Sequence, residues 1–535
     1  MTLLTISSAI ASTGAPLASV DVDVLIVPWF EDEGPGAVPG LDSASGGEIA
    51  RAIASKEFAG RLYDFFVTVA ADASCHARRI VLAGAGKRTS YGSDVARKLA
   101  TASGLWARQR HVTRVAFVMR NDTSCPANPE HRVHPEHREH PEHLQHSEHP
   151  EHLETEMAQA IAEGLTLAEF DAGRYKTVDA RPFGPTVWTI VVAAGEEAAS
   201  RAGAAITRGR VLGESSNLAR ELANEPGNTL TPREFARRAA AIASEGGVAV
   251  EILDEAQIAK LGMGLLLGVA RGSSEPPRLM VLRHDPPGAP AFPVLGLVGK
   301  GVTFDTGGIS IKSADGMERM KDDMAGGAAV ACAMRAIALL EAPIPVIGVV
   351  PMTENMPGGR AIKPGDILTS ASGQTVEVIN TDAEGRLILG DGLWYARQLG
   401  ATHLVDVATL TGAVVVALGK STTGLFGTPD GWVEQVRRVA NRVGDRAWPM
   451  PVFEDYRDQL RSEIADFTNT GGRPAGSITA ALFLQEFTGG LPWVHMDIAG
   501  TAWAEEAKPY LPKGPTGVAV RTLASLAFEP FEVGS

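Results

Sequence analysis

Two carboxylates and an arginine lie close together in the octapeptide of residues 380–387, as Asp382, Glu384 and Arg386. They follow an apolar run at 376–379, which predicts a buried strand. Lone charges are costly to hold beside a buried strand, because little water reaches them there. These charges therefore need partners that the octapeptide itself does not supply.

A second group of charged residues lies upstream and has the same chemical character. Lys300 and Asp305 follow the apolar run at 294–298, and Lys312 and Asp323 come soon after. In open α/β sheets, ligands bind at the carboxyl ends of strands, where separate segments of the chain meet. Together the two groups supply four carboxylates, two lysines and an arginine. Divalent metal ions are the simplest way to stabilise such a cluster.

Each carboxylate taken alone has an ordinary explanation, such as a helix cap or a turn, and Asp305 with the Thr-Gly-Gly that follows it fits a turn. The combination is harder to explain, because Gly307, Gly308 and Gly385 mark backbone that turns tightly or approaches another group closely. Oxygen ligands with one amine suit Zn²⁺, Mn²⁺ or Mg²⁺, and shared carboxylates suit a pair of ions. A lysine ligates a metal only when neutral, and adjacent cations lower its pKa.

Histidine is scarce outside one insert. A histidine occurs at every third position from His131 to His152, within an insert at 129–153. Such a tract can bind transition metals or sense pH. A solvated loop is the interpretation that we favour, because the composition cannot bury a core and the prolines fit polyproline II. The remaining histidines lack metal-ligand spacing, and His403 and His495 are expected to be hydrogen-bonded structural residues.

The overall composition is that of a folded protein with more than one domain, since the chain has 535 residues, 44% of them hydrophobic. The net charge of −14 disfavours general nucleic-acid or anionic-membrane binding, which needs clustered positive charge. No apolar run reaches the ~18 residues of a membrane span. Three cysteines without ligand or redox spacing are typical of a reducing compartment. A cytoplasmic protein is expected.

Strand-like and helix-like segments alternate along the chain, and this pattern predicts an α/β protein of two domains joined by a long helix. Residues 1–195 predict a smaller N-terminal α/β domain. Its predicted strands are 24–27, 80–83, 115–118 and 189–192, and its predicted helices include 46–66 and 92–108. Residues 196–224 predict the linking helix. Residues 225–535 contain both charged groups and predict a larger α/β domain with a central mixed sheet.

At these residues the chain resembles the leucyl aminopeptidase, or cytosol aminopeptidase, family. The octapeptide at 380–387 and the segment from 299 to 324 match the family pattern. Further matching segments are 408–413, 469–476 and 495–503. The resemblance covers about residues 215–525, is weak over the first 195 residues, and does not include the histidine tract. It implies that 225–535 is a catalytic metallopeptidase domain.

The resemblance also implies a role for each charged residue in a site for two metal ions. The metal ligands would be Lys300, Asp305, Asp323, Asp382 and Glu384. Asp305 and Glu384 would bridge the two ions. Chemistry alone does not separate Asp322 from Asp323, and Asp323 is the residue that matches.

Lys312 and Arg386 would be the catalytic residues that bind no metal, Lys312 by stabilising the oxyanion and Arg386 by holding a bicarbonate ion as general base. The substrate would be contacted by Met320, Thr409, Leu410 and Gly412. The expected reaction is the hydrolysis of N-terminal amino acids, preferably leucine and other apolar residues, from peptides with a free N-terminus. A homo-hexamer is also implied.

Two alternatives stay open from the sequence. The first is another dinuclear metal amidase or a phosphoesterase, since the same ligand chemistry would serve those reactions. The second is an additional DNA-binding role, against which the acidic balance of the chain argues.

Overall fold

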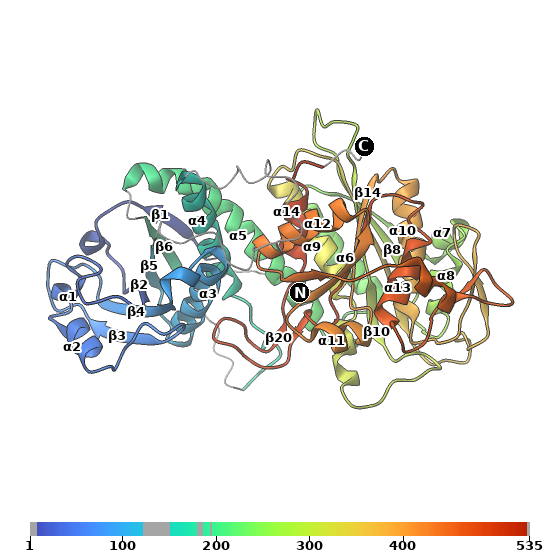
Figure 1. Ribbon diagram of the computed structural model, residues 1–535, viewed down its shortest axis with the longest axis horizontal. Coiled ribbons are helices and arrows are strands. Elements are labelled where there is room, and N and C mark those ends of the chain that lie inside the picture. The colour runs from blue at the N-terminus through green and yellow to red at the C-terminus, as the bar shows by residue number, and fades with distance from the viewer. Residues whose placement is uncertain (1–7, 121–149, 179–185, 193–194, 532–535) are drawn as a thin grey trace. The chain divides into compact units, whose positions relative to one another are not determined.

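The computed structural model describes residues 8–120, 150–178, 186–192 and 195–531, and the chain forms two compact units (Figure 1). One unit comprises residues 1–214 with 507–512, and the other comprises 215–506 with 513–535. The division falls within helix α5 (Glu196–Asn224), a single helix over the span for which a linking helix is predicted.

The N-terminal unit is built on a six-stranded sheet with the order β1-β6-β5-β2-β4-β3. Its strands are β1 (Ile10–Thr13), β2 (Val24–Phe30), β3 (Phe65–Val69), β4 (Arg79–Gly86), β5 (Arg114–Met119) and β6 (Val187–Val192). All neighbours are parallel except β3 and β4. The four strands predicted in this region are confirmed. Their burial on both faces explains why each appears in the sequence as a continuous apolar run.

Helices α3 (Ser93–Gln109) and α4 (Pro150–Leu167) pack against one face of this sheet, and α1 (Leu41–Ala44) and α2 (Glu48–Ala54) pack against the other. The helix predicted at 92–108 is confirmed. The helix predicted over 46–66 is wrong, since α2 ends before Ser55 and β3 begins at Phe65. Gly60 lies between them at φ 66°, where a Cβ would come within 2.6 Å of Phe30 O, so backbone contact with β2 replaces helix there.

The histidine tract lies mostly outside the described residues. Its last triplet, 150–152, forms the start of α4, so the expected polyproline II conformation is wrong for that triplet. Pro150 is the first residue of the helix, where the missing N–H of proline costs nothing.

The larger unit is built on a nine-stranded sheet with the order β16-β15-β18-β14-β9-β11-β8-β7, and β10 pairs with β11. Its strands are β7 (Ala249–Leu253), β8 (Arg278–His284), β9 (Leu295–Gly299), β10 (Gly301–Asp305), β11 (Val346–Asn355), β14 (His403–Ala408), β15 (Thr423–Thr428), β16 (Ala447–Pro449) and β18 (Trp493–Asp497). The pairs β18–β14, β14–β9 and β9–β11 are parallel, whereas β15–β18, β11–β8 and β7–β8 are antiparallel. The predicted mixed sheet is confirmed, and its four central strands end at one edge.

Helices cover both faces of this sheet (Figure 1). Helices α6 (Pro232–Glu245), α9 (Ala325–Leu339) and α14 (Val520–Leu526) pack together on one face. Helices α8 (Gly264–Ala270), α10 (Glu384–Gln398) and α13 (Gly476–Gln485) pack together on the other, over a large apolar cluster. The central strands are therefore buried on both faces, and their carboxyl ends are the part of the sheet at which polar groups can gather.

The run at 376–379 does not form a strand of this central sheet. Strand β13 spans only Thr375–Glu377 and lies between β12 (Ile367–Thr369) and β17 (Phe467–Thr468) in a separate three-stranded sheet. The octapeptide at 380–387 therefore approaches the edge of the central sheet from this small sheet.

Candidate metal centre

The carboxyl ends of the central strands bring the upstream charged group together. Lys300 directly follows β9, Asp305 ends β10, and Asp323 directly follows the 3₁₀ helix η6 (Met317–Asp322). All three side chains are buried. The strands thus position Lys300 and Asp305 directly, whereas Asp323 follows a 3₁₀ helix and contacts Lys300 through an ion pair.

The octapeptide supplies the other half of the cluster. Glu384 is buried at the start of α10, and Asp382 is half-buried two residues before it. A Cβ at position 385 would lie 2.7 Å from Lys300 Cε, so a glycine here lets Lys300 keep its position between the carboxylates. Gly307 has φ 85°, and a Cβ there would lie 2.8 Å from Asp382 Oδ1. The glycines noted in the sequence are therefore the points at which the two halves approach each other closely.

Two lysines join the halves. Lys300 Nζ lies 2.7 Å from Asp323 Oδ1 and 2.9 Å from Glu384 Oε1. Lys312 Nζ lies 2.7 Å from Asp305 Oδ2 and 2.5 Å from Asp382 Oδ1. Each ammonium thus pairs with one carboxylate of the upstream group and one of the octapeptide.

The carboxylates fit a site for divalent cations. Asp305, Asp382 and Glu384 each offer an oxygen atom, and these atoms all lie within 4.8 Å of one another. Asp323 Oδ2 is buried and has no hydrogen-bond partner among the described residues. Four carboxylates face only two ammonium groups, so the cluster has both the oxygen ligands and the excess negative charge that divalent metal ions neutralise.

The charged groups shift one another's proton affinities. Burial opposes charge on Lys300, but the carboxylates of Asp323, Glu384 and Asp305 outweigh burial and raise the pKa of this lysine. Burial raises the pKa of Asp323 and of Glu384. For Lys300 Nζ to ligate a metal its proton has to leave, and the cations themselves would favour that loss.

Asp323, and not Asp322, contacts this cluster. Asp323 Oδ1 accepts hydrogen bonds from Lys300 Nζ at 2.7 Å and from Thr409 Oγ1 at 2.8 Å. Asp322 is also buried, and burial raises the pKa of its carboxyl to about 6. Geometry thus separates two neighbouring aspartates that the chemistry of the sequence leaves equivalent.

Arg386 is buried near the cluster without forming part of it. Its Nη1 donates a hydrogen bond to the carbonyl of Asn469 at 3.1 Å, and its Nε has no partner among the described residues. Burial lowers the pKa of this guanidinium to about 10, against the opposing effect of nearby Glu384 and Asp497. The side chain therefore remains charged at neutral pH and keeps donor capacity for an anion.

Of the predicted substrate-binding residues, Thr409 forms hydrogen bonds with the cluster, and the others lie on neighbouring segments of the chain. Thr409 contacts Asp323, and its carbonyl accepts a hydrogen bond from Lys300 Nζ at 2.9 Å. Leu410 N donates to Asp497 Oδ1 at 3.1 Å, and Gly412 begins helix α11 (Gly412–Leu418). Met320 is half-buried in η6, three residues before Asp323.

Three buried residues that sequence reasoning missed organise these segments. Asn355 donates from Nδ2 to Asp305 Oδ1 at 2.8 Å. Asn469 accepts at Oδ1 from the backbone N–H of Ile379 at 2.8 Å and so anchors the approach to the octapeptide. Asp497 accepts hydrogen bonds from the backbone of the 409–411 segment. A polar residue that ends an apolar strand is the signal that could have pointed to Asn355 and Asp497.

The two histidines expected to be structural are confirmed as such. His495 is fully buried, with Nδ1 2.6 Å from Asp406 Oδ1. His403 Nδ1 lies 3.0 Å from Thr402 Oγ1, and the ring packs edge-on against Trp432. Neither contacts the carboxylates of the cluster.

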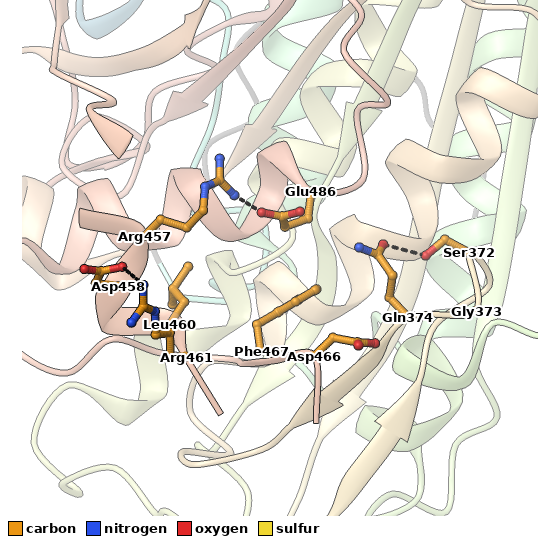
Figure 2. A pocket seen from close by; sticks show the side chains of 10 residues that line it. All are labelled: Ser372, Gly373, Gln374, Arg457, Asp458, Leu460, Arg461, Asp466, Phe467 and Glu486. Carbon is orange, nitrogen blue, oxygen red and sulfur yellow. Dashed lines mark hydrogen bonds and ion pairs between the residues drawn. The ribbon is translucent and has the colours of Figure 1, made fainter. Parts of the chain in front are cut away.

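A separate groove with a volume of about 610 Å³ lies beside the small sheet (Figure 2). None of the predicted site residues lines it. Figure 2 shows Arg457 pointing to Glu486, Arg461 to Asp458 and Gln374 to Ser372. Both arginines of this groove thus pair with lining carboxylates, and its remaining carboxylate, Asp466, accepts hydrogen bonds from Thr375.

Comparisons with known proteins match nearly the whole chain. The model of the cytosol aminopeptidase family, catalytic domain, matches residues 217–524, and the model of that family's N-terminal domain matches residues 26–127. A probable cytosol aminopeptidase of Solibacter usitatus is 46% identical over 514 residues, which are 96% of this chain and 98% of the relative. Another from Alkaliphilus metalliredigens is 51% identical over 374 residues, which are 70% of this chain and 74% of the relative.

Solved structures of similar fold were also found. A lysine-to-glutamate variant of tomato leucine aminopeptidase has a TM-score of 0.84 at 29% identity, covering 98% of this chain and 99% of that one. The bottromycin maturation enzyme BotP in complex with Mn has a TM-score of 0.78 at 32% identity, covering 95% of this chain and 100% of that one. Among helices in the described ranges, none combines the length and apolar composition of a membrane span.

Proposed function

The chain belongs to the cytosol aminopeptidase family, and we propose that its carboxylate cluster is the dinuclear metal centre at which it removes residues from the N-termini of peptides. The observation that carries this proposal is the close approach of Asp305, Asp382 and Glu384 at the carboxyl edge of the central sheet. The likeness to a leucine aminopeptidase structure over nearly the whole chain supports it.

The proposed metal ligands are those predicted from the sequence. Lys300 and Asp323 would serve one ion, Asp382 would serve the other, and Asp305 and Glu384 would bridge them. When bound, the two cations would acidify a water molecule and polarise the scissile carbonyl. Zn²⁺, Mn²⁺ and Mg²⁺ all suit these ligands, and the Mn complex of BotP makes Mn²⁺ a practical first choice for reconstitution.

The residues outside the ligand set have separate proposed tasks. Lys312 would donate a hydrogen bond to the oxygen that becomes negative as the peptide bond is attacked, since its ammonium already faces Asp305 and Asp382. Arg386 would hold a bicarbonate ion as the general base, because its buried guanidinium keeps an unused donor at Nε.

The substrate would lie along the segment that follows β14. The carbonyl of Leu410 and the backbone at Gly412 would align the peptide, and Thr409 would place it beside Asp323, with which its hydroxyl is already bonded. Met320 would line the pocket for the first side chain, which favours leucine and other apolar residues. The charged carboxylates of the cluster suit the free α-amine of the substrate.

The direct test is metal analysis of the purified protein together with a panel of aminoacyl p-nitroanilides. Because the histidine tract could bind metal itself, the count is made on a variant lacking residues 129–153 as well. We expect two ions per chain and turnover of leucine p-nitroanilide, with no turnover of its N-acetylated form. Hydrolysis of phosphate esters without cleavage of any free-amine substrate would overturn the proposal in favour of the phosphoesterase alternative, which the comparisons do not support.

Assembly and location are proposed on family resemblance alone. A homo-hexamer in the cytoplasm is the expected state, and an additional DNA-binding role is disfavoured by the net charge of −14. Light scattering of the purified protein would give the mass of the assembly directly, and a mass near that of a single chain would exclude the hexamer.

A further inference from the structure

We propose that Asn355 is a positioning residue that holds the two halves of the carboxylate cluster at the spacing that a pair of metal ions requires. Asn355 ends β11, and its side chain is buried. The inference rests on the proposed function, because it concerns the same centre. It adds a residue that is neither a metal ligand nor a group in contact with the substrate.

The side-chain amide of Asn355 contacts both halves of the cluster. Its Nδ2 donates to Asp305 Oδ1 at 2.8 Å and to the carbonyl of Thr381 at 3.0 Å, and Glu384 Oε2 lies 3.4 Å away. Asp305 belongs to the upstream group, whereas Thr381 and Glu384 belong to the octapeptide. The amide thus lies beside both carboxylates that are proposed to bridge the ions.

Asn355 is itself held by a central strand of the larger sheet. Strand β11 lies between β9 and β8, and the parallel register of β10 and β11 pairs Asp305 with Asn355. The carbonyl of Asn355 accepts hydrogen bonds from Thr306 N at 3.0 Å and Thr306 Oγ1 at 2.8 Å. A side chain mounted on a central strand is placed more accurately than one on a loop.

The loop that follows Asp305 is shaped to pass over this side chain. Gly308 has φ 67°, and a Cβ at this position would lie 2.8 Å from Asn355 Oδ1. Any larger residue at 308 would therefore displace the amide or the loop. The backbone of Gly308 therefore packs directly against the side chain of Asn355 beside the cluster.

A neutral amide suits this position better than the other polar side chains. A lysine or arginine would repel the metal ions, and an aspartate would add a further ligand. The NH₂ group of asparagine has two hydrogens, which allows one nitrogen to serve two acceptors at any pH. Asn355 therefore orients the carboxylates without competing for the metals, as hydrogen-bond partners of metal ligands commonly do.

The test compares Asn355→Ala and Asn355→Ser with wild type and with Asn441→Ala as the matched control. Asn441 Oδ1 accepts the backbone N–H of Ala447 at 3.1 Å, so its loss removes a structural hydrogen bond that is not part of the cluster. Each metal-free protein is titrated with Mn²⁺ by calorimetry, and kcat and KM for leucine p-nitroanilide are measured over a range of Mn²⁺ concentrations.

We expect both Asn355 variants to bind Mn²⁺ about 10–100-fold more weakly than wild type. Their kcat should recover in part at high Mn²⁺, with KM little changed, whereas Asn441→Ala should bind Mn²⁺ as wild type does. Variants of Asn355 that lower only the unfolding temperature and keep the wild-type Mn²⁺ affinity would overturn the inference. Serine keeps one donor and fills more space than alanine, so it provides the test if the alanine variant fails to fold. Absence of Mn²⁺ binding by wild type would instead refute the proposed function.

Discussion

The two units of the chain bury charge in opposite ways. In the N-terminal unit, Arg97 on α3 pairs with Glu163 on α4 at 2.5 Å, and Gln159 Nε2 donates a further hydrogen bond to Glu163 at 2.9 Å. In the larger unit, four carboxylates share two lysines at the end of the sheet. Arg97 also pairs with Asp94, which Lys98 contacts in turn. Two cations therefore balance two carboxylates there, whereas the cluster has an excess of negative charge.

The difference separates a structural charge pair from a site. A buried carboxylate with a cation of its own gains nothing further from a ligand, and it remains in place because breaking the pair would leave an isolated charge. A cluster with too few cations keeps excess negative charge, and its carboxylate oxygens lie close enough together to bind a cation jointly. Buried charge therefore indicates function only where the protein does not neutralise it.

Among the predicted changes, replacing Glu384 with alanine should have the largest effect, because it alters the cluster of the larger unit directly. The substitution removes a proposed bridging ligand, and it leaves Lys300 with one fewer carboxylate. We expect kcat/KM for leucine p-nitroanilide to fall by more than about 10³-fold. Loss of a residue that only supports a ligand already lowers metal affinity or activity by about 10–100-fold. Glu354→Ala is the control, because that carboxylate bonds Ser273 Oγ at 2.6 Å outside the cluster. Equal losses in the two variants would contradict the assignment.

Replacing Arg97 with alanine should lower the free energy of unfolding by about 3–5 kcal/mol, because Glu163 would stay buried without its cation. Urea unfolding of the full chain measures the change. The double variant Arg97→Met with Glu163→Met removes both charges and should be close to wild type in stability. A double variant as unstable as the single one would show that the pair is more than a self-neutralised structural contact.

Lys312→Ala tests the role of an ammonium that is not a proposed ligand. We expect kcat to fall by on the order of 10²–10³, the usual cost of removing one stabiliser of an oxyanion. Steady-state kinetics with saturating Mn²⁺ measures it, and Lys363→Ala, at an exposed lysine paired with Asp366, is the control. An unchanged kcat would remove Lys312 from the proposed mechanism.

Adding metal should produce the smallest effect of the series, an increase in the free energy of unfolding that depends on the cluster of the larger unit. At 100 times its dissociation constant, Mn²⁺ should stabilise the folded chain by about 2.7 kcal/mol, because it binds the native cluster and not the unfolded chain. Thermal unfolding with and without a chelator measures the shift. Arg97→Ala should keep this response, and Glu384→Ala should lose it. Persistence of the full response in Glu384→Ala would place the metal elsewhere, and the histidine tract would then be the first region to delete.

Sequence reasoning reached the fold class and the composition of the cluster because both depend on local patterns. Apolar runs predicted β2, β4, β5, β6 and β9, since strands buried on both faces are continuous apolar segments. The helix predicted over 46–66 failed because close backbone contact at Gly60 outweighs the local helical pattern. The run at 376–379 predicted a strand but not its partners, and strand β13 pairs only with the short strands β12 and β17.

The sequence by itself determined which charged residues need partners, because carboxylates, lysines and glycines at such spacing already show what must be neutralised and where the backbone must turn. Only the tertiary structure decided which of them meet. It showed that Asp323, which only the family resemblance had singled out, contacts Lys300, and that Asn355 contacts both halves of the cluster. The physical reason is that segments about 50–80 residues apart converge where parallel strands end, and strand pairing at that distance is not encoded in any local pattern.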